Sequence, residues 1–270
     1  MLVRNRTPRL VIQAIAITVL LALFALPFLV IVLGAFATSW SGVLPSGGTL
    51  GNFTTVFTES ATAHTVTASL ITAVVATVLA LAIATTAALS TRRSPALKRI
   101  VDTVFLLPVA IPSVAVGLAL LMAFSSGPLP LNGTVWIVVV AHTVLVVALA
   151  YQPISAAVTR LDPAFEEAAS ALGAGRARII ATIVLPLLRP AMAGAAAMCI
   201  AMSMGELTAM MMVAPPTWRT MPLQIFSFTS RGIRLYEGAA LAVLLLAITL
   251  TALLVLQRVA GRRTGIASGR

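Results

Sequence analysis

The chain has few side chains that could do chemistry, and one carboxylate stands apart from the others. Glu206 follows a run of small and apolar residues, 191–205, that is predicted to lie in a membrane. A carboxylate deep in a span is costly, and such residues usually face a bundle interior or a water-filled path. Glu206 is therefore either held by hydrogen bonds in a structural role, or it lines a solute path together with Met202 and Thr208.

No other residues have the spacing of a catalytic or metal site. His64 and His142 are isolated, and we expect His142 to be a hydrogen-bonded packing residue. The Met residues between 198 and 212 form a soft surface of the kind that packs helices together. The chain also lacks the G-x-x-x-x-G-K-[S/T] pattern that holds the phosphates of ATP. We therefore expect no catalytic residue, no metal site and no cofactor bound by this chain, and we do not expect an enzyme.

Composition places the chain in a membrane. Of its 270 residues, 60% are hydrophobic and 9% are charged, whereas a soluble domain has about 25% charged residues. The formal charge is +11, but all except one of the 18 basic residues are Arg, and they are spread over short segments between apolar runs. This distribution is typical of a membrane topology signal, and it does not indicate nucleic acid as a partner.

The elements that must position these side chains are predicted membrane helices. Apolar runs long enough to cross a bilayer predict an all-α polytopic protein with six spans in a single transmembrane domain, 1–270. Pro108 and Pro112 should bend or break the third span, 38–63 should be an exposed loop, and 215–237 should fold back against the bundle. The predicted spans are 10–37, 64–89, 100–124, 134–153, 191–214 and 238–259.

Basic residues predict the orientation of these spans. Six crossings place fifteen Lys and Arg residues, among them Arg4, Arg92 and Arg262, on the side that holds both termini and the segment 160–190. They place only Arg219, Arg231 and Arg234 on the other side. Cytoplasmic loops carry the excess of basic residues, so we expect both termini and 160–190 to be cytoplasmic.

The segment 160–190 predicts two amphipathic helices between the fourth and fifth spans. Asp162 followed by Pro163 is a good helix start, and a Gly at position 173 can end that helix in a left-handed turn. Glu166 and Glu167 lie near the positive end of the helix dipole. Helical spacing places one apolar face on Phe165, Ala168, Ala169 and Leu172. A surface hairpin between two spans is the simplest interpretation.

The order of residues within this segment is more specific than a hairpin. Glu167-Ala168-Ala169 is followed by Gly173, Ile183 and Leu185-Pro186. This order resembles at every fixed position the EAA loop of ABC importer permeases. The resemblance implies a type I ABC importer permease fold in the bacterial cytoplasmic membrane. It also implies that Asp162, Phe165, Glu166, Glu167, Ala168, Ala169, Leu172 and Gly173 form a coupling helix that docks on a separate ATPase.

The same resemblance implies several partners. They are two copies of a cytoplasmic ABC ATPase subunit that bind ATP and Mg, a second permease that is identical or homologous, an extracytoplasmic solute-binding protein and membrane lipid. Six spans are too few to enclose a gated path alone, which also leads us to expect the second permease.

Two further stretches are similar to one group within the family. Thr49 to Phe53 resembles a T-x-x-N-[F/Y] stretch that permeases for polyamines, ferric ion, sulfate and phosphonates have after the first span. Gly205 to Ala209 and Pro215 to Phe226 look most like permeases of 2-aminoethylphosphonate importers. The resemblance implies a phosphonate as the solute, and polyamine, ferric ion, sulfate, thiamine or another small solute stays open.

Two other classes of function are alternatives. A secondary transporter or channel could use Glu206 and His142 in a proton path, and a scaffold subunit would have no path of its own.

Overall fold

The computed structural model describes residues 6–230 and 232–261, and the chain forms two compact units. One unit comprises the chain as far as Ala63 together with Gln224–Leu244, and the other comprises His64–Leu223 and the chain from Leu245 onward. Arg4, Arg231 and Arg262, which entered the predicted orientation, lie outside the described residues. The same is true of Arg263 and Arg270.

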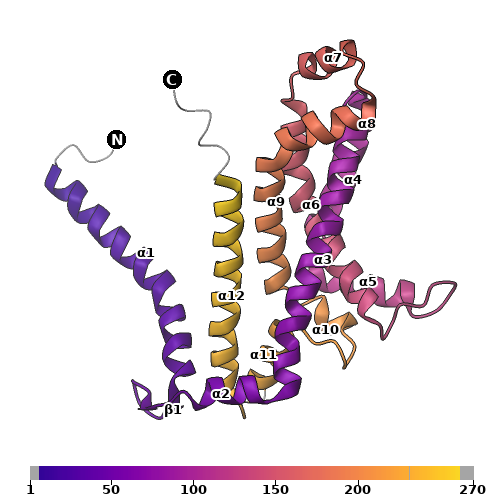
Figure 1. Ribbon diagram of the computed structural model, residues 1–270. Helices are drawn as coiled ribbons and strands as arrows, with labels where there is room; N and C mark the ends of the chain where they lie inside the picture. The colour runs from indigo at the N-terminus through magenta and orange to yellow at the C-terminus, as the bar shows by residue number, and fades with distance from the viewer. Residues whose placement is uncertain (1–5, 231, 262–270) are drawn as a thin grey trace. The chain divides into compact units, whose positions relative to one another are not determined.

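The first unit begins with an apolar helix and a short hairpin (Figure 1). Helix α1 (Arg6–Ala35) exposes its apolar side chains from Leu10 to Val32, as a helix in contact with lipid does. Strands β1 (Ala37–Ser39) and β2 (Ser46–Gly48) pair antiparallel, and helix α2 (Gly51–Thr58) follows. The prediction of a loop over 38–63 is corrected, because this stretch contains a hairpin and a helix.

Asn52 explains why the T-x-x-N-F stretch has its spacing. Its side-chain amide donates hydrogen bonds to the carbonyl oxygens of Ala35, at 3.0 Å, and Ala37, at 2.9 Å. Carbonyls at a helix end lack partners within the helix, and a side-chain donor satisfies them. The ring of Phe53 lies 4.9 Å from that of Phe36. These contacts join α2 to the end of α1.

Arg234 joins the two chain segments of the first unit. Its guanidinium lies 2.9 Å from Glu59 Oε2 and 3.4 Å from Glu237 Oε1, and it stacks 4.1 Å from the ring centre of Phe228. The hydrogen bond from Arg234 holds the pKa of the Glu59 carboxyl below its ordinary value. Helix α11 (Met221–Thr229) and helix α12 (Leu235–Gly261) lie on either side of Arg234 in the sequence.

The second unit is a helix bundle. Among the described residues of the whole chain, five helices are long and apolar enough to cross a membrane, and the bent pair of α4 and α5 gives a sixth crossing if it is one span. The remaining elements are α3 (Ser60–Thr91), α4 (Pro95–Ala110), α5 (Ser113–Phe124), α6 (Val135–Thr159), α7 (Pro163–Ala171), α8 (Arg176–Ile179), the π-helical turn η1 (Ile180–Val184), α9 (Leu185–Gly205) and α10 (Met210–Val213).

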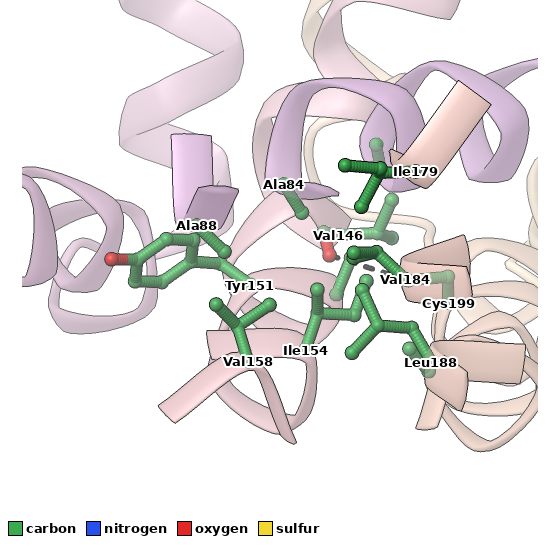
Figure 2. Packing of buried hydrophobic residues seen from close by; sticks show 13 residues of the cluster. Ala84, Ala88, Val146, Tyr151, Ile154, Val158, Ile179, Val184, Leu188 and Cys199 are labelled. Atoms are coloured by element: carbon green, nitrogen blue, oxygen red, sulfur yellow. Dashed lines mark hydrogen bonds between the residues drawn. The ribbon is translucent and has the colours of Figure 1, made fainter. Parts of the chain in front are cut away.

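Helices α6 and α9 form the main helix pair of the second unit, and α3 packs against them (Figure 2). Ala80, Ala84 and Ala88 recur every four residues on α3, and all three are buried. In lipid, helices associate by close fit, and small side chains let the backbones approach. The Cys199 thiol on α9 donates to the carbonyl oxygen of Val146 on α6, at 3.4 Å.

The third predicted span, 100–124, is broken by Pro112. Ile111 is extended, with φ −98° and ψ 132°, as the residue before a proline prefers, and α5 turns 103° away from α4. The predicted interruption is confirmed, and the helix begins earlier than predicted, at Pro95.

The predicted fifth span, 191–214, is corrected at both ends. The second helix predicted in the segment 160–190 does not end before residue 191. It continues into the span, because one helix runs from Arg176 to Gly205 without interruption. A π-helical turn precedes Pro186, whose ring would clash with the carbonyl four residues earlier in a regular helix. The helix then ends at Gly205, so Glu206 is its C-cap and does not lie inside a helix.

The segment predicted to fold back, 215–237, contains helix α11, and its first part binds α3. Trp218 Nε1 donates to Thr72 Oγ1 at 3.0 Å, and the backbone N–H of Met221 donates to Ser69 Oγ at 2.7 Å. The indole of Trp218 also meets the imidazole of His64 edge to face, with ring centres 5.4 Å apart.

The two interrupted helices meet at Gly117. A Cβ atom added to Gly117 of α5 would lie 2.9 Å from both Cα and O of Ala209, just before α10. Backbone atoms cannot move aside as a flexible side chain can, so this contact requires glycine. Val116, Ile137 and Met210 are among the buried side chains around it.

Substitution of this glycine should separate α5 from α10. We expect Gly117→Val to destabilise the folded chain by about 1–3 kcal/mol, which is the usual cost of overpacking. Thermal unfolding of the purified assembly in detergent measures the loss. Gly205→Ala is the matched control, because a Cβ atom there meets nothing within 4 Å. Equal midpoints for the two variants contradict the packing described.

Candidate functional site

Helix α7 has both of the ends that the sequence predicts. Asp162 Oδ1 accepts a hydrogen bond from the N–H of Ala164 at 2.9 Å, and Pro163 is the first helical residue. At the other end Gly173 has φ +82°, and the N–H groups of Gly173 and Ala174 donate to the carbonyls of Ser170, at 2.9 Å, and Ala169, at 3.0 Å. This pair of bonds is a Schellman motif, which glycine favours.

The apolar face of α7 is exposed in this chain. The side chains of Phe165 and Leu172 are 56% and 88% exposed, and Ala168 lies between them on the helix surface. Ala169 was predicted to share this face, but it is partly buried against the core below. Figure 1 shows α7 at one end of the second unit, beyond the ends of α6 and α8. An exposed apolar patch outside the spans is typical of an interaction site.

The two glutamates of α7 differ in their contacts and exposure. Glu166 forms an ion pair with Arg92 at the end of α3, whereas Glu167 is exposed. Both carboxylates border a cavity of about 510 Å³ between α7, α8 and the end of α3. Arg93, Ser170 and Arg176 also line this cavity.

A second site contains Glu206 and Thr208, two of the residues that the sequence predicts along a solute path. Its side chain is 5% exposed, and Oε1 accepts hydrogen bonds from the N–H of Ala209, at 2.8 Å, and from Thr208 Oγ1, at 3.0 Å. The Thr208 hydroxyl is also hydrogen-bonded to Ser113, the first residue of α5. Glu206 therefore closes the turn between α9 and α10 and is linked through Thr208 to the break between α4 and α5.

Met202 lies one helical turn before this cluster, and its side chain is 44% exposed.

His142 is buried between α6 and α9, where its Nδ1 is 2.6 Å from Ser203 Oγ. The predicted packing role of His142 is confirmed. Its other ring nitrogen, Nε2, has no hydrogen-bond partner among the described residues.

A polar network between α4 and α6 was missed in the sequence. Asp102 accepts hydrogen bonds from Lys98 Nζ, at 2.8 and 3.0 Å, and from the Tyr151 hydroxyl, at 2.7 Å, while Lys98 also reaches Ser155 at 3.2 Å. The ring of Phe105 stacks on that of Tyr151, with centres 4.2 Å apart. The four-residue spacing of Lys98 and Asp102 is a signal for an ion pair on one helix face, but it gives no sign of Tyr151.

Comparisons with known proteins agree with this architecture. A family model described as "Binding-protein-dependent transport system inner membrane component" matches residues 80–265. A relative from Salmonella typhimurium, named "Putative 2-aminoethylphosphonate transport system permease protein PhnV", is 41% identical and aligned over 97% of this chain and 98% of its own length. The putrescine transport system permease protein PotI of Escherichia coli is 30% identical over 52% of this chain and 50% of its own length.

The fold is also similar to that of a solved structure. A chain in the crystal structure of a bacterial alginate ABC transporter, bound to a periplasmic protein that carries an alginate pentasaccharide, superposes with a TM-score of 0.76. The match covers 98% of both chains at 17% sequence identity, so it shows a shared fold.

The turn after α7 should depend on its glycine. A residue with a side chain costs roughly 1–2 kcal/mol in the left-handed conformation of Gly173. We expect Gly173→Ala to loosen this turn and to speed tryptic cleavage after Arg176 several-fold in inside-out membrane vesicles. Gly175→Ala is the control, since Gly175 has φ −69° and open space around it. Cleavage at the same rate in both variants contradicts the Schellman turn.

Proposed function

The chain belongs to the family of binding-protein-dependent transport system inner membrane components, and we propose that it moves a phosphonate such as 2-aminoethylphosphonate through an ATP-driven importer. It is a multi-pass permease of the bacterial inner membrane. The observation that carries the solute assignment is the 41% identity, along almost the whole chain, to a relative named for 2-aminoethylphosphonate transport.

In this proposal α7 is the coupling helix that binds the ATPase subunit. The exposed side chains of Phe165 and Leu172 support this role, because they form an apolar surface that nothing in this chain covers among the described residues. Burial of a Phe or Leu side chain contributes about 1.5–3 kcal/mol. Asp162 and Gly173 fix the two ends of α7, and Glu167 and Ala168 lie on its exposed surface. Glu166 and Ala169 connect α7 to the rest of this chain, through the ion pair with Arg92 and through packing against the core.

The proposal also assigns the partners. Two copies of the ATPase bind ATP and Mg and perform the hydrolysis, so this chain itself is not an enzyme. A second permease, identical or homologous, completes the path, and a solute-binding protein delivers the solute to the outer surface. Membership of a binding-protein-dependent family favours this arrangement over a secondary transporter or a scaffold subunit.

We propose further that Glu206, Thr208 and Met202 lie along the solute path. Met202 and Thr208 are exposed, and the hydroxyl of Thr208 donates to the Glu206 carboxylate behind it. Interrupted helices at membrane depth are typical of transporter binding sites. A carboxylate there suits the ammonium group of 2-aminoethylphosphonate.

The first test concerns the contact with the ATPase. We expect Phe165→Ala and Leu172→Ala each to weaken retention of the ATPase by roughly tenfold or more, as loss of that burial predicts. Retention is measured by co-purification of the complex over a range of salt and detergent. Leu97→Ala is the matched control, because Leu97 is an exposed apolar residue on α4. If both α7 variants retain the ATPase as Leu97→Ala does, α7 is not the coupling helix.

The second test concerns the solute. In proteoliposomes that contain the complete importer, we expect ATP-dependent uptake of labelled 2-aminoethylphosphonate, which fails to occur if the solute assignment is wrong. Glu206→Gln keeps an oxygen that can accept from Ala209 and Thr208 but removes the carboxylate, and we expect uptake to fall about tenfold, as loss of a charged hydrogen bond predicts. Glu237→Gln is the control. If Glu206→Gln takes up the solute at an unchanged rate, the assignment of the solute still stands, but Glu206 does not lie along the solute path.

A further inference from the structure

Arg92 contacts the start of α7 through two of its guanidinium nitrogens. One guanidinium nitrogen, Nη1, forms the ion pair with Glu166 in the first turn of α7, and Nη2 donates to the carbonyl oxygen of Leu161, just before the helix, at 3.0 Å. Leu161 and Glu166 are 69 and 74 residues away from Arg92 in the sequence. Arg92 therefore fixes α7 to the end of α3 on both sides of the helix start.

The chemistry of this contact distinguishes it from an ordinary surface ion pair. Exposed pairs contribute about 0–1 kcal/mol, but the side chains of Arg92 and Glu166 are only 19% and 26% exposed. The planar guanidinium holds its two acceptors in a fixed geometry that a lysine ammonium cannot reproduce. Within residues 6–230 and 232–261, this is the ion pair that connects α7 to the residue directly after α3.

After α7 the chain reaches α8 through Gly173 and Gly175. The two backbone hydrogen bonds of the Schellman turn fix this end of α7, and Ala169 and Ala174 pack against the core of the second unit. The guanidinium of Arg92 adds a separate connection, from the start of α7 to the residue directly after α3.

Helix α3 is suited to carry a displacement over a long distance. It runs from Ser60 to Thr91 without a glycine or proline, so it contains none of the residues that usually bend a helix. In its first half Ser69 accepts a hydrogen bond from the backbone N–H of Met221, and Thr72 accepts one from the indole N–H of Trp218. Ser69 lies about 35 Å along the helix from Arg92, at 1.5 Å per residue.

We propose that α3 is a rigid rod which Arg92 clamps to α7 and which carries movements of α7 to the segment 214–222. That segment directly follows α10 and the Glu206 turn, so its displacement would reach the place where the interrupted helices meet. This inference rests on the proposed role of α7 as the ATPase contact. It assigns a positioning role to Arg92, Glu166, Ser69 and Thr72.

The test uses the complete importer in nanodiscs with Trp218 as the reporter. The other two tryptophans, Trp40 and Trp136, are replaced by Phe, and the ATP-induced change in Trp218 fluorescence is measured together with solute moved per ATP hydrolysed in proteoliposomes. We expect Arg92→Ala to keep the ATPase bound, to abolish the fluorescence change and to lower solute per ATP about tenfold, within the range of coupling between residues of one network. Arg93→Ala is the matched control.

Two further variants separate a positioning role from a loss of folding. The exchange of charges, Arg92→Glu with Glu166→Arg, should restore at least part of the fluorescence change that either single variant abolishes. Thr72→Val removes the acceptor for Trp218 and should lower solute per ATP as Arg92→Ala does, and the two substitutions together should be no worse than either alone.

The outcomes also separate this inference from the proposed function. If Arg92→Ala and Thr72→Val retain the ATPase and transport solute per ATP like the unmodified importer, or if their effects add, α3 is not the rod. If the unmodified permease retains no ATPase, the proposed function of α7 fails first, and the inference fails with it.

Discussion

The backbone of a membrane helix has to satisfy its own hydrogen bonds, because hydrocarbon offers no other partner. This chain interrupts two such helices, at Pro112 and at Glu206, and it can do so because the two interruptions lie together. The Glu206 carboxylate accepts the N–H of Ala209, and Gly117 lets α5 approach the backbone there. Helix α6 packs against this meeting point through Ile137, Val138 and Ala141.

The sequence contains no ATP-binding pattern. Under the proposed function the movement comes from the ATPase subunit, and α7 receives it. Its ends are fixed by Asp162 and Gly173, its exposed face is apolar, and its partly buried side contacts the rest of the second unit through Glu166 and Ala169. Under this proposal the exposed apolar face of α7 binds the ATPase, and the ion pair of Glu166 with Arg92 connects the helix to the end of α3.

Local chemistry decided which features could be predicted from the sequence. Asp162-Pro163 and Gly173 determine the ends of α7 by rules that involve only neighbouring residues, and both ends were predicted correctly. The break at Pro112 was also predicted, whereas Pro108, named with it, lies inside α4. The end of α9 at Gly205 was missed, since an apolar run continues past it and the break depends on Glu206 bonding to Ala209. The hydrophobic pattern of the sequence gives no sign of the hydrogen bond between Glu206 and Ala209.

Contacts between distant residues lay beyond the sequence. In the sequence Arg92 is only part of a topology signal, because its partner Glu166 is 74 residues away and nothing local connects them. Nothing in the sequence connects Asp102, within the predicted third span, to Tyr151, although Tyr151 and Lys98 both donate hydrogen bonds to it. The T-x-x-N-F stretch was recognised by resemblance, and its physical reason, the amide of Asn52 on the end of α1, appears only when the fold is known.

Chemical labelling of one position on α7 tests the central claim most directly. Leu172→Cys places a thiol at the exposed C-cap of α7, whereas the native Cys199 is buried. A membrane-impermeant maleimide should label position 172 in inside-out vesicles stripped of ATPase, and added ATPase should protect it. Labelling from the outside of intact cells, or labelling that the ATPase does not change, contradicts the account.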